Sequence, residues 1–389
     1  MMQDAYQPGR VYQFNFPTVI RFGSGVWREI APHLKQEKVQ RPLLVTDATV
    51  AGLEFFHKIH EHLLENGLSP TVFCNISKNP IKSDVLKGRM AYHEAGCDAV
   101  LGVGGGAALD VARAVALAVH HTRDLFDYDD LTGGDVYVTE PIPPFYTVPT
   151  TAGTGSEVGR SAIISEDDTH RKRILFSPRL MARRVFADPT LTYALPPGPT
   201  AATGMDALTH NMEAFLARNF HPICDGVALE GMALIAGNIE KAVHEPQNET
   251  ARALMLLGSI MGAIAFQKGL GVVHSMSHPL STLVDMHHGL ANAINLPYGM
   301  AFNLKYCPEK FQRMAQRLGL SSGRDIPDFL LQLNERLNLP TTLRAAGVKE
   351  EHLEPLTELA VQDFAHPNNP VPVSRADFAQ LYRQAFGAC

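Results

Sequence analysis

Between residues 43 and 148, short runs rich in valine and leucine alternate with longer stretches of helical periodicity, and this alternation restricts the fold most. Apolar runs bounded by helical stretches are typical of parallel strands that are buried on both faces and joined by crossover helices. The pattern predicts strands over residues 43–46, 71–74, 99–103 and 145–148, with helices over residues 50–66, 83–95 (N-capped by Ser83) and 108–119. The first part of the chain is therefore expected to be an α/β domain.

The pattern changes after Asp188-Pro189. A turn cluster at residues 195–199, Leu-Pro-Pro-Gly-Pro, is followed by long stretches with helical periodicity and almost no strand signal. A chain of 389 residues with 45% apolar content is long enough to bury two cores. We expect an α/β domain over residues 1–195 and an all-helical domain over residues 196–389.

Charge and composition exclude several classes of protein. The formal net charge is -6 and the basic residues form no long run, which argues against nucleic acid as a partner. A charged and apolar leader is missing, and nowhere do 18 apolar residues run together, so neither secretion nor membrane insertion is expected. Five scattered cysteines without a CxxC pair fit free thiols in a reducing cytoplasm.

Two loops of small residues follow two of the predicted strands. The first, Gly104-Gly105-Gly106, lies between a strand and a helix, where glycine allows close approach of a ligand and exposed N–H groups attract phosphate. The second spans residues 150–156 and offers hydroxyl groups at the carboxyl end of another strand. Asp47, at the end of the first strand, suits a ribose diol and would repel a 2′-phosphate. The alternatives are a tight turn, a polar surface loop and a helix cap.

The strongest signal for chemistry is a group of histidines in the second half of the chain. Asp206 and His210 are spaced i, i+4, which places a carboxylate and an imidazole on one helix face. His274 and His278 repeat this spacing, and His287 and His288 follow nine and ten residues after His278. Any one of them alone fits an ordinary core or surface histidine. Together they indicate a site for Fe(II), Zn(II), Ni(II) or Co(II), among which the ligand types do not choose.

These features, in this order, resemble the iron-containing (group III) alcohol dehydrogenase family over nearly the whole chain. The motifs that carry the resemblance are GGGAALDVAR at 104–113, PTTAGTGSE at 149–157, DPTLT at 188–192, TGMDALTHNMEA at 203–214, HSMSHPL at 274–280 and HGLANAINLP at 288–297. The family fold is a dinucleotide-binding α/β domain followed by an all-α metal-binding domain, as in dehydroquinate synthase. Members are commonly dimers or larger homo-oligomers.

The resemblance assigns roles to individual residues. It implies metal ligands at Asp206, His210, His274 and His288, and it places His278 near the substrate and the nicotinamide without making it a ligand. His287 stands where the family commonly has proline. The NAD contacts that the resemblance implies are Asp47, Asn79, Gly104, Gly105, Gly106, Thr150, Thr151, Thr154 and Lys172.

Three departures from the family pattern concern cofactor affinity and leave the metal ligands intact. Ala107 replaces a serine whose hydroxyl would reach the diphosphate, Arg113 replaces a lysine, and Lys78 replaces a proline before Asn79-Pro80. Arginine keeps the charge of lysine but differs from it in geometry.

The expected activity is an NAD-dependent and metal-dependent interconversion of a small primary alcohol or diol and its aldehyde, by hydride transfer in a cytoplasmic enzyme. Three His and one Asp leave a coordination position for a substrate oxygen, on which the cation acts as a Lewis acid. His278 would relay the released proton. The alternatives are a hydroxyacid-oxoacid transhydrogenase and an NAD-using lyase of the dehydroquinate synthase type. Ethanol, butanol, lactaldehyde and 1,3-propanediol are all candidate substrates.

Overall fold

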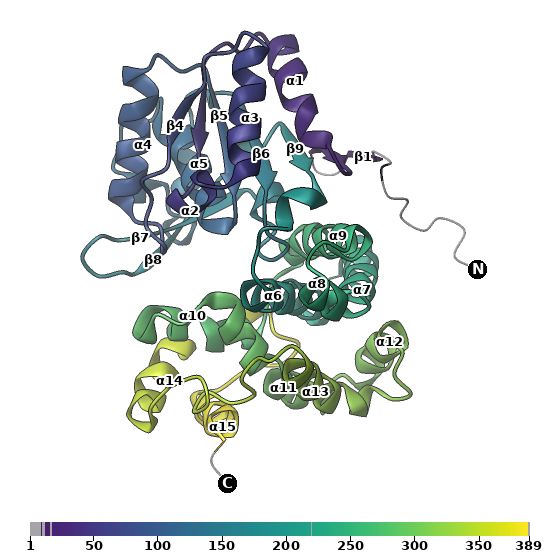
Figure 1. Ribbon diagram of the computed structural model, residues 1–389. Coiled ribbons are helices and arrows are strands. Elements are labelled where there is room, and N and C mark those ends of the chain that lie inside the picture. The colour runs from purple at the N-terminus through teal and green to yellow at the C-terminus, as the bar shows by residue number, and fades with distance from the viewer. Residues whose placement is uncertain (1–8, 10–11, 16–17, 219, 388–389) are drawn as a thin grey trace. The chain divides into compact units, whose positions relative to one another are not determined.

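A seven-stranded sheet organises the first part of the chain (Figure 1). The computed structural model describes residues 9, 12–15, 18–218 and 220–387. Within them the strand order is β1-β2-β9-β6-β5-β3-β4, and every pairing is parallel except that of β1 with β2. The strands are β1 Tyr12–Asn15, β2 Val19–Phe22, β3 Pro42–Val45, β4 Thr71–Phe73, β5 Ala99–Gly104, β6 Phe145–Pro149 and β9 Arg184–Ala187. The predicted α/β class of this part is confirmed.

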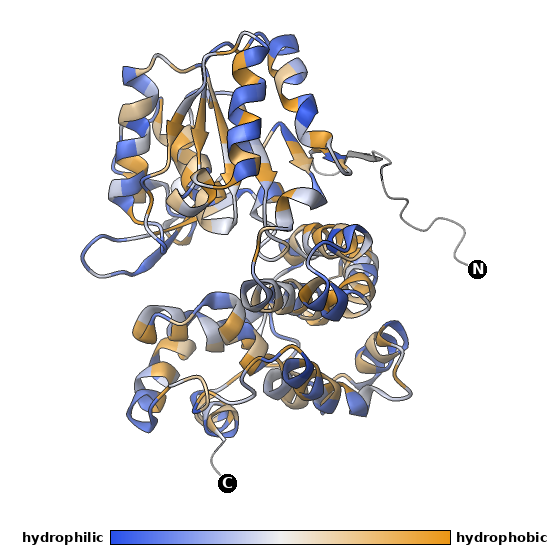
Figure 2. Ribbon diagram, in the orientation of Figure 1, coloured by the Kyte–Doolittle hydropathy of each residue, from blue (hydrophilic) through white to orange (hydrophobic). Residues whose placement is uncertain are grey.

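Helices cover both faces of the sheet, because successive residues of a strand point to opposite faces. Leu44 and Leu101 share one core with the helices α1 Ile30–Gln36 and α3 Glu54–Glu65. Leu43 and Val100, one position earlier, belong to the opposite core with α4 Lys82–Glu94 and α5 Gly106–Ala118. Figure 2 shows hydrophobic strands between helices whose outer faces are hydrophilic. This double burial explains why the strands appear in the sequence as continuous apolar runs.

The helix predicted over residues 50–66 is in fact two helices. The Asp47 side chain accepts a hydrogen bond from Val50 N–H and caps α2 Ala48–Ala51, which ends at Gly52, and α3 then starts after Leu53. Ser83 was expected to cap the next helix, but α4 already begins at Lys82. The N–H of the cap residue Ile81 is bonded by the Asp84 carboxylate instead. A side chain three residues inside the helix thus replaces the predicted cap.

A second, smaller sheet packs beside α5. It consists of two antiparallel strands, β7 Ser161–Ser165 and β8 Lys172–Phe176, which the sequence pattern did not indicate. Ala162, Ile164 and Leu175 are fully buried in the core that contains α5. Short 3-10 helices make up much of the remaining connections, at Val26–Glu29, Leu125–Tyr128, Asp130–Thr132, Gly134–Tyr137, Ser156–Val158, Pro178–Leu180 and Pro189–Thr192.

The described residues after 195 form helices and no strands. The longer helices are α6 Pro197–Leu216, α7 Pro222–Ala236, α8 Ile239–His244, α9 Glu249–Ala265, α10 Val272–Val284, α11 His288–Leu304, α12 Pro308–Leu318, α13 Ile326–Arg336, α14 Leu353–Val361 and α15 Arg375–Phe386. Short 3-10 helices lie at Phe266–Lys268, Gly323–Asp325, Glu350–His352 and His366–Asn368. The predicted all-helical second part is confirmed.

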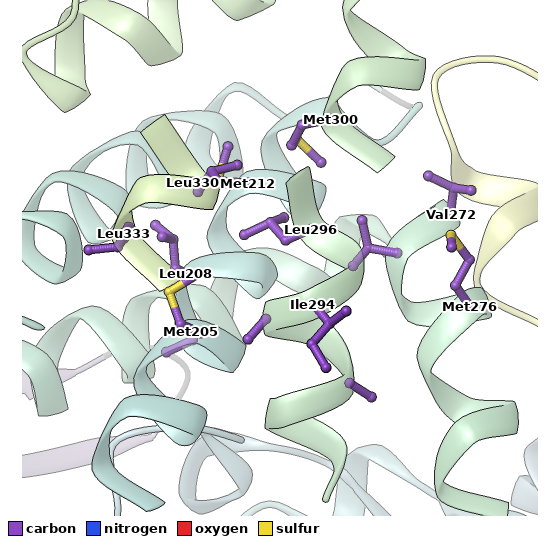
Figure 3. Packing of buried hydrophobic residues seen from close by; sticks show 14 of the residues in the cluster. Met205, Leu208, Met212, Val272, Met276, Ile294, Leu296, Met300, Leu330 and Leu333 are labelled. Atoms are coloured by element: carbon purple, nitrogen blue, oxygen red, sulfur yellow. The ribbon is translucent and has the colours of Figure 1, made fainter. Parts of the chain in front are cut away.

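One hydrophobic core joins the helices that carry the candidate metal ligands. Met205 and Leu208 of α6, Met276 of α10, and Ile294 and Leu296 of α11 are all fully buried in it. Figure 3 shows side chains of α6, α10, α11 and α13 converging there. Close packing of this kind fixes the helices against one another, so polar side chains that alternate with the core residues are held in defined positions.

By their contacts, the residues divide into two units whose boundary is not a single cut. One unit holds residues 1–151 and 155–194, and the other holds residues 152–154 and 195–389. Gly153 shows why three residues of the loop belong to the helical unit. Its carbonyl accepts a hydrogen bond from Ser259 Oγ at 3.1 Å, and an added Cβ would lie 2.7 Å from the Cβ of Thr203.

Among the described residues, one helical stretch is long and apolar enough to cross a membrane. It is Glu249–Lys268, and 61% of its most apolar window is buried inside the protein. This stretch contains α9, whose Met255 and Leu256 are buried at 2% and 0% exposure. The apolar character of this stretch is therefore explained by its place in the helical core.

Candidate metal centre

Four side chains from three helices bring ligand atoms together in the helical unit. Asp206 and His210 lie on α6, His274 on α10 and His288 at the first position of α11. Their ligand atoms all lie within 4.8 Å of one another. All four residues predicted from the sequence as metal ligands are thus gathered at one place.

Two distances between the ligand atoms are short enough for both partners of each pair to bind one ion. Asp206 Oδ1 lies 3.6 Å from Nε2 of His210 and 3.6 Å from Nε2 of His288. With metal–ligand bonds of about 2.1 Å, ligand atoms at tetrahedral angles are about 3.4 Å apart. One carboxylate and three imidazoles suit the first-row divalent metals, from iron to zinc. The donor types, and the two distances from Asp206, therefore fit a divalent cation.

Three of the four candidate ligands are buried. Asp206, His210 and His274 are 2%, 5% and 1% exposed. Burial lowers the pKa of His210 to about 4, although the charge of Asp206 acts in the opposite direction. Burial would also lower the pKa of His274, but the hydrogen bond and charge of Glu213 outweigh it and raise that pKa. His210 is consequently a neutral imidazole at neutral pH, with a lone pair available for an ion.

Asn292 also reaches into the group of ligand atoms. It lies four residues after His288 on α11 and is completely buried. Its Nδ2 is 2.7 Å from Asp206 Oδ1, 3.3 Å from His274 Nε2 and 3.1 Å from His288 Nε2. Its Oδ1 has no hydrogen-bond partner among the described residues. The amide nitrogen of Asn292 thus lies among the four candidate ligand atoms and donates to Asp206.

His278 lies next to the ligands but belongs to a different hydrogen-bonded pair. Its Nδ1 is 2.7 Å from Oδ2 of Asp363, whose Oδ1 accepts a hydrogen bond from Ser275 Oγ. Burial would raise the pKa of Asp363, but the charge and hydrogen bond of His278 outweigh it and lower that pKa. The ring stacks on Phe364 at a centroid distance of 5.2 Å. With a side chain 19% exposed, His278 is accessible for proton exchange.

The candidate NAD residues of the α/β unit gather at the carboxyl ends of three neighbouring strands. Gly104 ends β5, Gly105 is the N-cap of α5, and Gly106 is the first residue of that helix. Thr150 donates its N–H to the Gly104 carbonyl. A Cβ added to Gly105 would lie 3.2 Å from Thr151, and one added to Gly104 would lie 3.8 Å from Asp47 Oδ2, so these loops lie close together.

Three further candidate NAD contacts, Asn79, Lys172 and Thr154, lie outside this group of residues. Lys172 begins β8 and pairs with Ser165 of β7, and Ser165 is also bridged to Ile81, two residues after Asn79. Asn79 and Lys172 are therefore associated with the small sheet. Thr154 belongs by its contacts to the helical unit. The amide groups at the start of α5 remain the part of the α/β unit best suited to a diphosphate.

Arg113, which stands where a lysine was expected, is completely buried in the α/β unit. Its guanidinium donates to Ser156 Oγ at 2.9 Å, to the carbonyls of Ser161 at 2.8 Å and Leu180 at 3.2 Å, and to Asp110 at 3.3 Å. A guanidinium has five N–H groups in a planar fork, whereas an ammonium donates from a single point. The substitution therefore ties α5 to the loop that contains Ser156.

Reasoning from the sequence missed three residues at the metal centre: Glu213, Asn292 and Asp363. For two of them a signal was present. Glu213 follows Asp206 by seven residues and Asn292 follows His288 by four, and both spacings place the pair on one helix face. Asp363 comes from a distant segment, 85 residues after His278, and local spacing could not have found it.

Known proteins resemble this chain along almost its whole length. A sequence model described as iron-containing alcohol dehydrogenase matches residues 17–189, and one described as Fe-containing alcohol dehydrogenase family, C-terminal, matches residues 200–386. A 4-hydroxybutyrate dehydrogenase of Cupriavidus necator is 40% identical over 356 residues, which are 89% of this chain and 92% of the relative.

Two solved structures share the fold. A crystal structure of 1,3-propanediol oxidoreductase has a TM-score of 0.91 and 33% identity, and the match covers 97% of this chain and 99% of that one. The sulfoacetaldehyde reductase of Bifidobacterium kashiwanohense, in complex with NAD+, has a TM-score of 0.88 and 28% identity, with 98% and 100% covered.

The parallel α/β sheet and the buried cluster of one Asp and three His agree with an enzyme that uses a dinucleotide and a divalent metal. The chain belongs to the iron-containing alcohol dehydrogenase family. It is an oxidoreductase, and its family implies NAD and a divalent metal as cofactors.

Proposed function

We propose that this enzyme interconverts a short primary alcohol, carrying a second polar group at its far end, and the corresponding aldehyde, with NAD as hydride carrier. The observation that carries the proposal is the group of four ligand atoms within 4.8 Å. Three of the similar proteins suggest the substrate class. The names 4-hydroxybutyrate, 1,3-propanediol and sulfoacetaldehyde each describe a short chain that ends in a carboxylate, a hydroxyl or a sulfonate opposite the reacting carbon.

Asp206, His210, His274 and His288 would hold the divalent metal, with iron as the proposed ion and zinc, nickel or cobalt as alternatives for the same donors. A cation bound there polarises the substrate oxygen and lowers the pKa of an alcohol. These four donors would leave a further coordination position for the substrate oxygen.

His278 is proposed to carry the proton that the alcohol loses. The Asp363 carboxylate only accepts hydrogen bonds, so Nδ1 of His278 carries the hydrogen and Nε2 keeps its lone pair. An imidazole held in one tautomer by a carboxylate is a suitable general base at neutral pH. Asp363 acts as a positioning residue for His278, and Ser275 orients Asp363 in turn.

For NAD, the proposal uses the N-terminus of α5 and the loops around it. Gly104, Gly105 and Gly106 bring backbone N–H groups to the diphosphate, and the hydroxyls of Thr150, Thr151 and Thr154 add donors. Asp47 favours NAD over NADP, since its carboxylate accepts hydrogen bonds from a ribose diol and repels a phosphate. Asn79 and Lys172 complete the proposed contacts.

We further propose a cytoplasmic homo-oligomer of at least two chains. The four cysteines that the structure describes, Cys74, Cys97, Cys224 and Cys307, form no disulfide, which agrees with a reducing compartment. Cys389 lies outside the described residues. Neither nucleic acid nor a membrane is a proposed partner.

The deciding experiment purifies the protein without chelator, measures its metal content, and follows NADH formation from 4-hydroxybutyrate, 1,3-propanediol, ethanol and 1-butanol. Metal-dependent NADH formation that is faster with the first two substrates supports the proposal. One equivalent of metal without NADH release favours the transhydrogenase or the lyase instead. A protein that binds none of the four metals overturns the proposed site.

A further inference from the structure

Glu213 is a buried carboxylate that ligand chemistry does not explain. It lies on α6 and is 2% exposed. Its Oε2 is 2.6 Å from Nδ1 of His274 and accepts the N–H of Gly271 at 3.1 Å, while its Oε1 accepts the N–H of Val273 at 2.7 Å. A carboxylate without partners would be costly at this depth, and these donors compensate it.

The periodicity of α6 explains why Glu213 can reach His274. Asp206, His210 and Glu213 are spaced i, i+4 and i+7, so they lie along one face of the helix. The first two point to the proposed ion and the third points to the first turn of α10, which carries His274. One helix face thus supplies both ligands and the partner of a ligand that lies on another helix.

The contact between Glu213 and His274 selects a tautomer. A carboxylate accepts and cannot donate, so the ring hydrogen of His274 resides on Nδ1. The lone pair then resides on Nε2, the nitrogen 3.3 Å from Asn292 Nδ2 and on the side of the other ligand atoms. A histidine that binds metal through one nitrogen commonly donates its other N–H to such a carboxylate.

We propose that Glu213 is a positioning residue for the metal centre, which holds His274 in its metal-binding tautomer and fixes the start of α10 before any ion binds. This inference rests on the metal site proposed above. It assigns a function to a residue of the TGMDALTHNMEA motif that is not itself a ligand.

Glu213→Gln tests the proposal, because glutamine keeps one oxygen as an acceptor for the backbone N–H groups but replaces the other with an NH₂ donor. Facing His274 Nδ1, that donor favours the opposite tautomer, with the hydrogen on Nε2. We expect the affinity for Zn(II) or Co(II), measured by competition with a chromogenic chelator, to fall by about 10- to 100-fold. Nitrogen-15 shifts of the His274 ring in the metal-free protein should move to those of the other tautomer, with His274→Asn used for assignment.

Asn369→Ala is the matched control, since Asn369 Oδ1 also accepts a backbone N–H of the same helix turn, that of Val272, and no contact joins it to the His274 ring in the described structure. A purely capping role for Glu213 predicts that both variants melt earlier and lose metal affinity equally. That result, or a Zn(II) affinity of Glu213→Gln within twofold of the wild type, overturns the inference. If the wild type itself binds no metal, the proposed site fails as well, so the two failures are distinguishable.

Discussion

Gly289 of α11 lies so close to Ala202 of α6 that an added Cβ would stand 2.4 Å from the Ala202 carbonyl oxygen and 3.3 Å from Asp206 Cβ. Gly289 directly follows His288, so the two helices approach each other at the candidate ligands His288 and Asp206. Only a residue without a side chain allows this separation, which gives the glycine of the HGLANA motif a physical reason.

Gly289→Ala should therefore destabilise the protein by about 1–3 kcal/mol, because the new methyl group must push α11 from α6. The same displacement separates His288 from Asp206, so metal content should fall as well. Denaturation in urea and metal analysis measure the two effects.

Gly226→Ala on α7 provides the control, since nothing lies within 4 Å of a Cβ at that position. Alanine in a helix interior is more favourable than glycine by about 0.5–1 kcal/mol, so this variant should be as stable as the wild type or more so. A Gly289→Ala protein with unchanged stability and full metal content would contradict the proposed packing.

His288→Ala is expected to remove one of four ligands and to leave the protein with little bound metal and no detectable dehydrogenase activity. His287→Ala, one position earlier, changes a residue that lies outside the group of four ligands and should retain stoichiometric metal. Metal analysis of both purified variants distinguishes the two positions. Equal loss in both variants would mean that the ligand set is misassigned.

His278→Asn should slow turnover without emptying the metal site. Loss of a general acid–base group commonly costs about 10²- to 10⁴-fold in rate, and the ring is not a proposed ligand. Asp363→Asn, which leaves the ring but removes the charge that fixes its tautomer, should lower kcat by about 10- to 100-fold with little change in KM. Steady-state kinetics and metal analysis measure both.

Ser275→Ala removes one hydrogen bond to Asp363 and leaves the contact of Asp363 with His278. Its turnover should therefore fall less than that of His278→Asn or Asp363→Asn. If the metal were lost together with activity in His278→Asn, His278 would be a ligand and its proposed role would be wrong.

Glu157 should make the stability of the α/β unit depend on pH. Burial raises the pKa of this carboxyl from 4.5 to about 7, although the charge of Arg113 opposes the change. The pKa of Glu157 is higher in the folded than in the unfolded protein. The stability that the protonated carboxyl contributes is therefore fully present below about pH 4.5 and is lost as the pH rises through about 7. This difference in pKa corresponds to a loss of about 3 kcal/mol in the free energy of unfolding.

Glu157→Gln abolishes this ionisation, so the wild type should lose stability relative to the variant between about pH 5 and about pH 8. The midpoints of urea denaturation of the wild type and of Glu157→Gln, measured at both pH values, test this. Glu94→Gln, at an exposed position of α4, is the control. Parallel pH profiles for Glu157→Gln and the wild type would refute the prediction.

Local pattern predicted β3, β4, β5 and β6, because strands buried on both faces appear as apolar runs, but it did not indicate β1, β2, β9 or the helix α1. It failed where a single side chain decides a boundary, as at Asp47 and Asp84, whose carboxylates cap helices. The small sheet of β7 and β8 was missed because its strands are short and its burial depends on α5, which lies far away in the sequence.

The candidate ligands could be proposed because two of them share one helix face and the rest match motifs of the family. Their partners could not be derived from residue spacing alone. Glu213 contacts a histidine 61 residues later and Asp363 one 85 residues earlier, and only the packed helices bring such pairs together. The raised pKa of Glu157 likewise results from burial, and the sequence alone does not show whether a polar residue is buried.

The segment 152–154 has a consequence for how this protein can be divided. A fragment that starts at residue 195 keeps all four candidate ligands but loses Gly153, which accepts the Ser259 hydroxyl and packs on Thr203, three residues before Asp206. Residues 195–389 alone therefore do not make up the complete helical unit. Chimaeras that exchange it between relatives must carry these three residues with it, and a gene cut once at the boundary would encode an incomplete module.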